Sequence, residues 1–350
     1  MARPKGATNK KKAFVNTLGD AVRFISCAQR PLGNDVDTHC MMFNKWIVAT
    51  NGVLTAAHAI QDDMRICPHT MMLLAAMDSC TGPYSMTQES DAGLWVVSGD
   101  FRAFIPCVTP TALPMMAPDA PVALVDVRFL DSLAHVASLV ADNATTVLQA
   151  SIQLCGRSVR ATDTEVIVES WHGIDMPPGL LIPKSAANAL LKCGKKPVRF
   201  GVSQLSLTFW YEDNSWIKTQ LFTNTELPDM DRILNVASNP WPTPKGLFEA
   251  AASIAPFSTN GLAKFADNGV MKTDNADTDL LANMTVAGLP AGLSFKFKNL
   301  KSIAAFAKQI DFTASPKFAL FFGDNVRGAI AKYVTPDTDE VSDDDIPPET

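Results

Sequence analysis

The 350-residue sequence lacks any run of 18 apolar residues and has no beginning typical of a secretory signal, so we expect neither a membrane-spanning helix nor export. Its seven cysteines are scattered without a C-x-x-C spacing, which argues against a disulfide framework or a structural zinc site. Charged residues make up only 19% and hydrophobic residues 47%, a composition that excludes a disordered chain. We therefore expect a globular, cytoplasmic protein with a large buried core.

The sequence also lacks the motifs of common enzymes. It has no G-x-x-x-x-G-K-[ST] phosphate loop, no H-E-x-x-H zinc motif and no G-x-S-x-G elbow. Residues 54–58 resemble the histidine segment of chymotrypsin-like proteases, but no G-D-S-G-G serine loop accompanies them, so His58 would have no nucleophile to activate. Carboxylates at 35–37 and 277–279 could bind a cation, although such groups usually face water. We predict no enzymatic activity, no cofactor and no metal.

Acidic charge is concentrated near the C-terminus. The net charge is −6, and residues 337–350 hold seven acids and no base, whereas residues 1–336 carry 30 bases and 29 acids. The simplest interpretation of residues 337–350 is a solvated, disordered acidic tail, and a recruiting peptide is the alternative.

Two unrelated signatures recur with nearly the same period. Thr-Ala-Leu-Pro-Met-Met at 111–116 recurs as Thr-Glu-Leu-Pro-Asp-Met at 225–230, an offset of 114. Ala-Thr-Asn at 49–51 recurs as Ala-Thr-Asp at 161–163 and as Lys-Thr-Asp at 272–274, offsets of 112 and 111. Because self-similarity at a fixed period indicates a repeat architecture, we predict three modules. Their expected bounds, followed by the tail, are 1–119, 120–236, 237–336 and 337–350.

Each module orders its predicted elements alike. An amphipathic helix opens it, strands surround the Thr-Asn/Asp element, and a second helix and further strands close it. The helices are expected at 10–28, 68–78, 127–141, 183–193, 244–255 and 298–310. The strands include 46–50, 93–97, 101–108, 158–162, 205–211, 216–223 and 318–322, with linkers near 118–121 and 239–244. This content predicts an α+β fold built from tandem modules of two helices plus sheets.

Three further features make the sequence resemble the bacterial-type DNA sliding clamp, the beta subunit of DNA polymerase III. Residues 159–163 (Val-Arg-Ala-Thr-Asp) look like that family's V-A-T-D-G-H-R-L element, and 227–234 (Leu-Pro-Asp-Met-Asp-Arg-Ile-Leu) look like its F-P-D-Y-R-R-V-L-P crossover. Residues 332–336 (Lys-Tyr-Val-Thr-Pro) are similar to its closing Y-V-V-M-P strand. The departures are Thr164, Glu165 and Val166 in place of the family's glycine, histidine and arginine, and the acidic tail. Such divergence, with the compact length, would suit a phage-encoded member.

The resemblance implies a head-to-tail homodimer whose six modules form a ring around double-stranded DNA, with helices lining the hole and sheets outside. It implies a processivity factor of DNA replication that tethers DNA polymerase and is opened by a separate ATP-driven clamp loader. Partners that share a short apolar peptide motif would dock in a pocket between the second and third modules. The pocket residues that the resemblance implies are Leu148, Thr162, Thr164, Glu165, Val166, Ile167, Pro228, Arg232, Ile233, Tyr333, Val334 and Pro336.

The charges of the predicted helices agree with a DNA-lining role. Duplex DNA carries about one negative charge per ~1.7 Å of axis, so the helices that face it should be basic. The six predicted helices together carry +7, which leaves −6 for the rest of residues 1–336 and indicates a basic lining and an acidic exterior. The expected DNA-facing residues are Lys11, Lys12, Arg23, Lys184, Lys192, Lys245, Lys298, Lys301 and Lys308.

Two other functions stay open at this point. The chain could be a clamp-like scaffold or mimic that binds replication proteins without encircling DNA, and a monomeric mass would favour that alternative over the ring. It could also be an enzyme that uses the loop carboxylates and a divalent metal, which a nuclease assay on linear and circular DNA would test.

Overall fold

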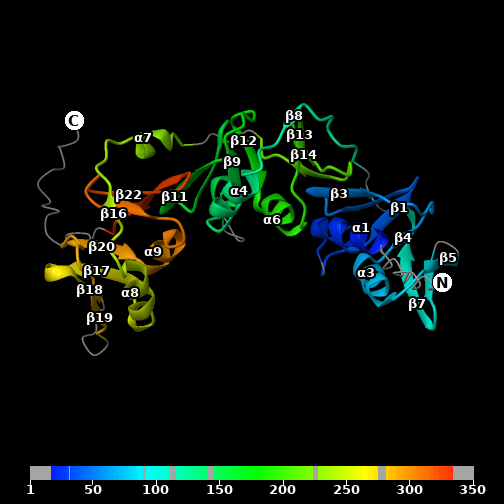
Figure 1. The fold of residues 1–350 in the computed structure, drawn as a ribbon, viewed down its shortest axis with the longest axis horizontal. Helices are drawn as coiled ribbons and strands as arrows, with labels where there is room; N and C mark the ends of the chain where they lie inside the picture. The colour runs from blue at the N-terminus through cyan, green and yellow to red at the C-terminus, as the bar shows by residue number, and fades with distance from the viewer. Residues whose placement is uncertain are drawn as a thin grey trace, which may run out of the picture. The chain divides into compact units, whose positions relative to one another are not determined.

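The computed structural model describes residues 17–30, 32–89, 92–110, 116–140, 146–223, 228–274 and 281–333. These residues fold as two compact units (Figure 1). The described parts of 1–137, 150–159 and 172–225 form unit 1, and those of 138–149, 160–171 and 226–350 form unit 2. Among the described helices, none has the length and apolar character needed to cross a bilayer. The division into three modules remains a prediction from the repeats.

Within the described residues, unit 1 contains two antiparallel sheets, a further antiparallel strand pair and five α-helices. The seven-stranded sheet has the order β1-β2-β3-β15-β14-β13-β8, and the four-stranded sheet has the order β4-β7-β6-β5. The strands are β1 Cys40–Phe43, β2 Trp46–Thr50, β3 Leu54–Ala59, β4 Cys67–Pro68, β5 Ser85–Glu89, β6 Gly93–Ser98, β7 Phe101–Val108, β8 Ala123–Leu124, β13 Arg199–Val202, β14 Ser206–Trp210 and β15 Trp216–Gln220, with the pair β9 Ser151–Leu154 and β12 Leu180–Pro183. The helices are α1 Thr17–Ile25, α2 Asp35–Thr38, α3 Thr70–Ser79, α4 Phe129–Ala137 and α6 Lys184–Lys192.

Helices α1 and α4 pack on the seven-stranded sheet of unit 1, α1 against β3 and α4 through Phe129, which stacks on Phe209 of β14. Helix α1 buries Leu18, Ala21, Val22 and Ile25, which share one face at helical spacing, and packs against β3 and α3 (Figure 1). Helix α4 packs against α6, which begins directly after Pro183 at the end of β12. The opposite face of the sheet is therefore left for other contacts.

Unit 2 is built from a four-stranded antiparallel sheet and a second antiparallel ladder. The four-stranded sheet has the order β19-β18-β17-β20, and the ladder runs β11-β23-β22-β21-β16, with residues 160–162 of β10 beside β11. The strands are β10 Ser158–Thr162, β11 Val166–Trp171, β16 Trp241–Pro242, β17 Leu262–Ala266, β18 Val270–Thr273, β19 Asn283–Thr285, β20 Leu293–Lys296, β21 Gln309–Asp311, β22 Phe318–Gly323 and β23 Val326–Ala331. The helices are α5 Val147–Ala150, α7 Asp231–Leu234, α8 Leu247–Ile254 and α9 Phe297–Ile303.

All six predicted helices are present, and the largest error at an end that the structure describes is at the end of the last one. The sequence places a helix at 298–310, whereas α9 ends at Ile303. Residue 308 instead joins the ladder, because its N–H donates to the carbonyl of Phe322 and its own carbonyl accepts from the N–H of Thr243. Apolar residues at 303, 304 and 307 continue the apolar pattern of the helix past its observed end. The helix stops there because residue 308 is hydrogen-bonded to the sheet instead.

The two expected linkers are also more structured than predicted. Trp241 and Pro242, within the expected linker 239–244, form strand β16 and pair with β21. In the segment 116–120 the side chain of Asp119 accepts hydrogen bonds from the hydroxyls of Ser206 and Thr208 at 2.9 and 2.8 Å. Lys218 Nζ donates to the carbonyl of Ala117 at 2.7 Å. These hydrogen bonds hold segment 116–120 on the face of the seven-stranded sheet that is opposite the helices, which we call its outer face.

Buried His172 gives unit 1 a pH-dependent stability. Its ring is fully buried and lies edge-on to Phe129, with centroids 5.5 Å apart, and burial lowers the pKa of His172. Nearby Asp126 raises this pKa and Arg128 lowers it further, and the net direction is down. Because the unfolded chain then takes up the proton first, stability is lost as pH falls below about 6.5.

We expect the free energy of unfolding to fall by up to about 1.4 kcal/mol per pH unit below pH ~6.5, and His172→Leu to reduce that slope. Urea unfolding at a series of pH values from 7.5 to 5 measures this slope for the parent chain and for the His172→Leu variant. His39, whose pKa burial also lowers, accounts for part of the slope that remains. An unchanged slope in the His172→Leu variant would show that this ring is not the titrating group.

Candidate functional site: an apolar pocket in unit 2 and the basic helices

The turn between β10 and β11 is built by its own side chains. Thr162 Oγ1 donates to the carbonyl of Val166 at 2.8 Å, and Asp163 Oδ1 accepts from the N–H groups of Glu165 and Val166 at 2.9 and 2.7 Å. Thr164 has a φ of 78°, a left-handed conformation that is unfavourable for a β-branched residue. The hydrogen bonds on both sides of Thr164 therefore hold this residue in a left-handed conformation that it would not otherwise prefer.

The β2–β3 turn of unit 1 has the same construction. Thr50 Oγ1 donates to the carbonyl of Leu54 at 2.8 Å, and Asn51 Oδ1 accepts from the N–H groups of Val53 and Leu54 at 3.1 and 2.8 Å. Gly52, with a φ of 81°, stands where Thr164 stands in the other turn. The recurrence of Ala-Thr-Asn as Ala-Thr-Asp thus reflects one turn built twice.

Beyond the β10–β11 turn, three adjacent strands of unit 2 present an apolar row. Ile167 lies opposite Ala329, and Ala329 lies opposite Leu320 in the register of β11, β23 and β22. Met230 and Leu234, at the start and end of α7, pack onto this row. Partly buried side chains surround these five residues: Leu148, Ile233, Val236, Ala314, Phe318 and Phe322. We call this hydrophobic cluster the unit 2 pocket, after the partner site that the resemblance implies; its five central residues are buried and its outer members are partly buried.

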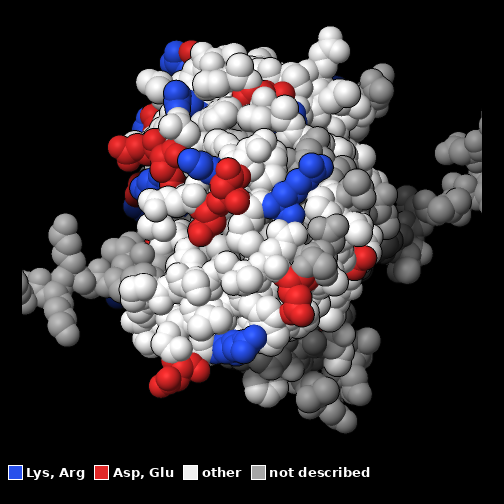
Figure 2. All heavy atoms as spheres, turned by 90° about the vertical axis from the view of Figure 1, so that its right-hand side faces the viewer, with Lys and Arg blue, Asp and Glu red and all other residues white. Residues whose placement is uncertain are grey.

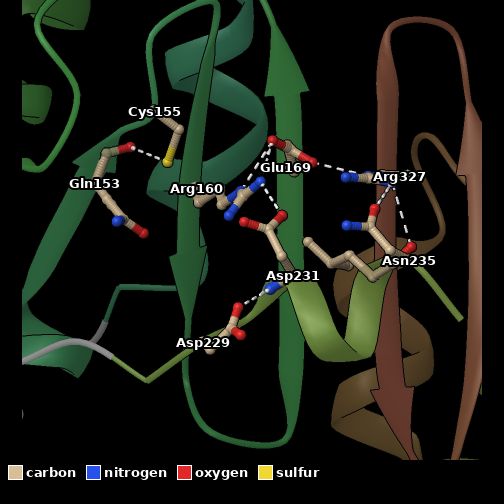
Figure 3. A network of polar contacts seen from close by, with 9 residues as sticks. Gln153, Cys155, Arg160, Glu169, Asp229, Asp231, Asn235 and Arg327 are labelled. Atoms are coloured by element: carbon tan, nitrogen blue, oxygen red, sulfur yellow. Dashed lines mark hydrogen bonds and ion pairs between the residues drawn. The ribbon is translucent and has the colours of Figure 1, made fainter.

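A buried ion network fixes α7 beside the pocket (Figure 3). The Glu169 side chain is only 3% exposed and accepts from Arg160 Nε and from Arg327 Nε, each at 2.8 Å. Arg160 Nη2 also donates to Asp231 on α7 at 2.7 Å, and this hydrogen bond lowers the pKa of Asp231. Arg327 Nη1 donates to Asn235 Oδ1 at 3.0 Å, just past α7. Both ends of α7 are therefore tied to the strands that carry the pocket.

The β10–β11 turn is joined to α9 by two lysines. Lys298 Nζ lies 2.8 Å from Glu165 Oε2 and 3.9 Å from Asp163 Oδ2, and Lys296 Nζ donates to Glu165 Oε1. Burial opposes ionisation of Glu165, but the hydrogen bonds from both lysines outweigh it and lower the pKa of that carboxyl. The hydrogen bond with Glu165 likewise raises the pKa of Lys298. Glu165, which departs from the family pattern, is thus neutralised by neighbouring lysines.

The principal helices pack in three pairs, α1 with α3, α4 with α6, and α8 with α9. Within their observed bounds these six helices carry five bases and four acids, much less positive charge than the predicted spans. Arg128 and Lys245 precede α4 and α8, Lys308 follows α9, and residues 10–12 lie outside the described residues. Of the six excess positive charges of the predicted helices, three therefore lie on these flanking residues and three at residues 10–12.

The predicted DNA-facing residues have different surroundings. Arg23 on α1 is paired with Asp20 at 3.1 Å and with Asp78 on α3 at 2.6 Å, and Lys298 with Glu165. Lys184 and Lys192 lie at the two ends of α6, Lys245 lies just before α8, and Lys308 donates to Asp324. Lys301 on α9 lines a cavity of about 520 Å³ between α8 and α9. Lys11 and Lys12 lie outside the described residues. On the face of unit 1 seen in Figure 2, acidic and basic side chains are interspersed.

Neither a protein-family model nor a curated protein matches the sequence. Solved structures do match. A putative DNA polymerase III beta subunit from Eubacterium rectale ATCC 33656 is 11% identical, with 90% of this chain and 96% of that chain covered and a TM-score of 0.76. The beta subunit from the DNA polymerase of Streptococcus pyogenes is 14% identical, with 92% and 99% covered and a TM-score of 0.75. A DNA polymerase sliding clamp from Pseudomonas aeruginosa is 13% identical, with 91% and 97% covered and a TM-score of 0.74.

The chain has the sliding-clamp fold. This confirms the α+β fold class expected from the sequence and the fold that the resemblance implies. At 11–14% identity the likeness shows the fold alone, and the roles of individual residues rest on the geometry of this chain.

Within the sliding-clamp fold, the structure brings some predicted pocket residues together and separates others. Leu148, Ile167 and Ile233 belong to the unit 2 pocket, and Arg232 is exposed beside Ile233. Val166 is fully buried and, as the neighbour of Ile167 in β11, points to the opposite face of the sheet. Thr162, Thr164 and Glu165 form the turn already described, and Pro228 and Tyr333 are exposed. Val334 and Pro336 lie outside the described residues.

The sequence reasoning missed several pocket residues. Met230, Leu234, Leu320 and Ala329 are buried members of the cluster, and Phe318 and Phe322 are partly buried members. The alternation of Phe318, Leu320 and Phe322 along one strand was the available signal, because alternate residues of a strand face the same side. No metal site was predicted, and among the described residues no three His, Cys, Asp or Glu side chains are grouped so as to hold a metal ion. The carboxylates at 277–279 lie outside the described residues.

The corresponding row in unit 1 has opposite chemistry. Thr55 lies opposite Lys218, and Lys218 opposite Thr208, in the place that Ile167, Ala329 and Leu320 occupy in unit 2. Lys218 Nζ lies 3.3 Å from Asp119, so this row is polar and already occupied by the 116–120 segment. The clamp fold thus repeats the backbone while only unit 2 keeps an apolar pocket at this position.

The apolar surface of unit 1 lies two residues farther along the same strands. Ala57 and Trp216 lie opposite each other there, at the place that Glu169 and Arg327 occupy in unit 2. With Val48, Trp46 and Trp210 they line a cavity of about 670 Å³ on the outer face of the sheet. We call it the tryptophan cavity. It is a control surface for tests of peptide binding at the unit 2 pocket.

Proposed function

We propose that the chain is a sliding clamp, a processivity factor that encircles duplex DNA as a head-to-tail homodimer and tethers a DNA polymerase. The observation that carries this proposal is the match of the clamp fold over 90% of the chain, and the hydrophobic cluster at the crossover, where the resemblance implies partner binding, supports it. A closed ring retains DNA by topology, so the modest helix charge is sufficient for weak contacts with phosphates. Opening of the ring belongs to a separate loader.

The deciding experiment measures retention on DNA. The protein is assembled on nicked circular DNA in the presence of a cognate or surrogate clamp loader, isolated by gel filtration, and the DNA is then cut once. Retention on the circle followed by release on linearisation supports a ring, and sedimentation should give the mass of a dimer. Equal loss from circular and linear DNA would contradict encirclement.

The second candidate is a clamp-like scaffold or mimic that binds replication proteins without DNA. The observation that favours it is the low net charge of the six helices within their observed bounds, with Arg23 and Lys298 engaged by carboxylates. A monomeric mass combined with peptide binding at the unit 2 pocket would support the mimic over the ring.

Charge reversal on the helices tests the DNA contacts. We expect Lys184→Glu, Lys192→Glu and Lys301→Glu together to weaken binding to linear duplex DNA at least about tenfold at low salt. The reason is that each lost phosphate contact removes about one unit from the slope of log K against log salt. Fluorescence anisotropy at several salt concentrations measures both quantities. The exposed Lys264 on β17 provides the control Lys264→Glu, and an equal effect of that control would point to non-specific charge rather than a lining.

A further inference from the structure

The described chain leaves unit 2 beside the pocket. Ala331, the last residue of β23, lies opposite Phe318 at the pocket edge, and the N–H of Lys332 donates to the carbonyl of Lys317 at 2.9 Å. Tyr333, whose N–H donates to the carbonyl of Ser294 at 2.8 Å, is the last described residue. The 17 residues that follow can span at most about 55–60 Å when extended, far more than the distance across the pocket.

Three carboxylates around the pocket are already neutralised. Glu169 lies between Arg160 and Arg327, and Asp231 pairs with Arg160 at 2.7 Å. Glu165 is held by Lys296 and Lys298 in the same way. These three carboxylates therefore offer little repulsion to an approaching acidic segment, whereas exposed Asp229, which directly precedes Met230, has no ion pair with a cation of the described residues.

Three cations beside the pocket have no such partner. Arg232, Lys317 and Lys332 form no ion pair with any carboxylate of the described residues. Arg232 directly precedes Ile233, and Lys317 directly precedes Phe318, so both adjoin pocket side chains. Lys332 Nζ donates to the carbonyl of Ser315 at 2.6 Å, next to Ala314 of the pocket. Three cations without a carboxylate partner among the described residues thus adjoin the pocket, and two of them, Lys317 and Lys332, lie beside the end of β23.

Residues 337–349 have the complementary chemistry. They contain seven Asp and Glu residues and no base, and their one apolar stretch is Ile346-Pro347-Pro348. We propose that this acidic segment docks in the unit 2 pocket of its own chain and competes there with partner peptides. The proposal rests on the proposed function in taking this pocket as the partner site, and it adds a regulation of that site.

Tethering makes such docking effective without high affinity. A short flexible connection gives an effective concentration in the millimolar range, so a segment with an intrinsic Kd of about 1 mM is bound roughly half the time or more. Consecutive prolines favour an extended conformation, which lowers the entropy lost on docking. Because the charge contacts are exposed, salt should weaken the docking.

The test compares the full chain with a full-length neutral-tail variant, in which the seven acids of 337–349 become Asn or Gln and Ile346→Ser is added. The probes are fluorescein-labelled octapeptides that carry Leu and Phe at adjacent, i+2 and i+3 positions, chosen to match the apolar pocket. We expect the neutral-tail variant to bind the best octapeptide at least about twofold more tightly at 50 mM salt, with the difference largely lost at 500 mM salt.

A second measurement places the segment. A synthetic peptide of residues 337–350 should bind the neutral-tail variant, compete with the octapeptide, and bind much less tightly after Phe318→Ala or Arg232→Ala. If the octapeptide binds both forms equally and peptide 337–350 does not compete, the autoinhibitory docking is wrong while the partner pocket stands. If no octapeptide binds either form but peptide 337–350 binds and depends on Phe318, the segment docks as proposed and the partner role of the pocket fails. Binding that ignores Phe318 and Arg232 places the segment elsewhere and overturns the inference.

Discussion

Replacing Glu169 with alanine is expected to lower the free energy of unfolding of unit 2 by about 3 kcal/mol. Glu169 is buried between Arg160 and Arg327, and its removal leaves both guanidinium groups without their shared carboxylate (Figure 3). Breaking a buried ion network by removing one partner is destabilising by about 3–5 kcal/mol, because a buried charge is left uncompensated. Arg160 keeps Asp231 and Arg327 keeps Asn235, which places the expected value at the low end of that range.

The measurement is urea unfolding of the full chain, followed by calorimetry to separate the two units. Trp171 gives a local signal, because the Arg327 guanidinium carbon lies 5.2 Å from the centre of its ring. The matched control in the same unit is Asp324→Ala, which removes an exposed ion pair with Lys308 and should change stability by about 0–1 kcal/mol. Equal effects of the two substitutions would show that the Glu169 network contributes no more than a surface pair.

Replacing Arg160, Glu169 and Arg327 together separates two quantities. One is the free energy lost when a buried charge is left unpaired, and the other is the net contribution of the intact network to stability. The variant Arg160→Met, Glu169→Leu, Arg327→Met should recover most of the stability that Glu169→Ala loses, because no buried charge is left behind. Its octapeptide affinity is informative as well. Asp231 and Asn235 would lose their partners, so we expect α7 to be held less firmly beside the pocket and binding to weaken.

The local part of this site was accessible from the sequence. The recurrence of Ala-Thr-Asn as Ala-Thr-Asp predicted a shared element, and in both copies the threonine hydroxyl and the Asn or Asp side chain build the same turn. Helices with a clear apolar face, such as α6 and α8, were predicted within three residues of their observed bounds. Their signal is carried by residues three and four positions apart.

The contacts between distant segments were not accessible. Arg160 and Glu169 lie on neighbouring strands, but Arg327 comes 158 residues after Glu169, and nothing local marks it as a partner. The end of α9 was also missed, because hydrogen bonds from Lys308 to a distant strand end a helix that its own apolar pattern would continue. Repeats predicted equivalent backbone positions in the two units but not their chemistry. Thr55 and Ile167 hold the same place with opposite character.

The polar row of unit 1 and the apolar row of unit 2 lead to the second large prediction. We expect Ile233→Ala and Phe318→Ala together to weaken binding of the best octapeptide to the neutral-tail variant by about 100-fold. Both side chains are partly buried members of the unit 2 pocket, and loss of central apolar anchors typically costs 1 kcal/mol or more each, so the pair removes about 2–3 kcal/mol of binding free energy. Fluorescence anisotropy measures the affinity, and urea unfolding checks that the fold is kept.

The tryptophan cavity supplies the control that makes this result specific. Trp46→Ala removes a larger apolar side chain from an open apolar surface of the same chain, but in unit 1. If partner peptides bind where Ile167, Ala329 and Leu320 form the apolar row, Trp46→Ala leaves octapeptide affinity within about twofold of the parent. If instead Trp46→Ala abolishes binding and the Ile233 and Phe318 pair does not, the docking surface lies in unit 1. The apolar row of unit 1 lies two residues farther along its strands than the apolar row of unit 2. In that case the partner site would lie on the row of unit 1 and not on the row of unit 2.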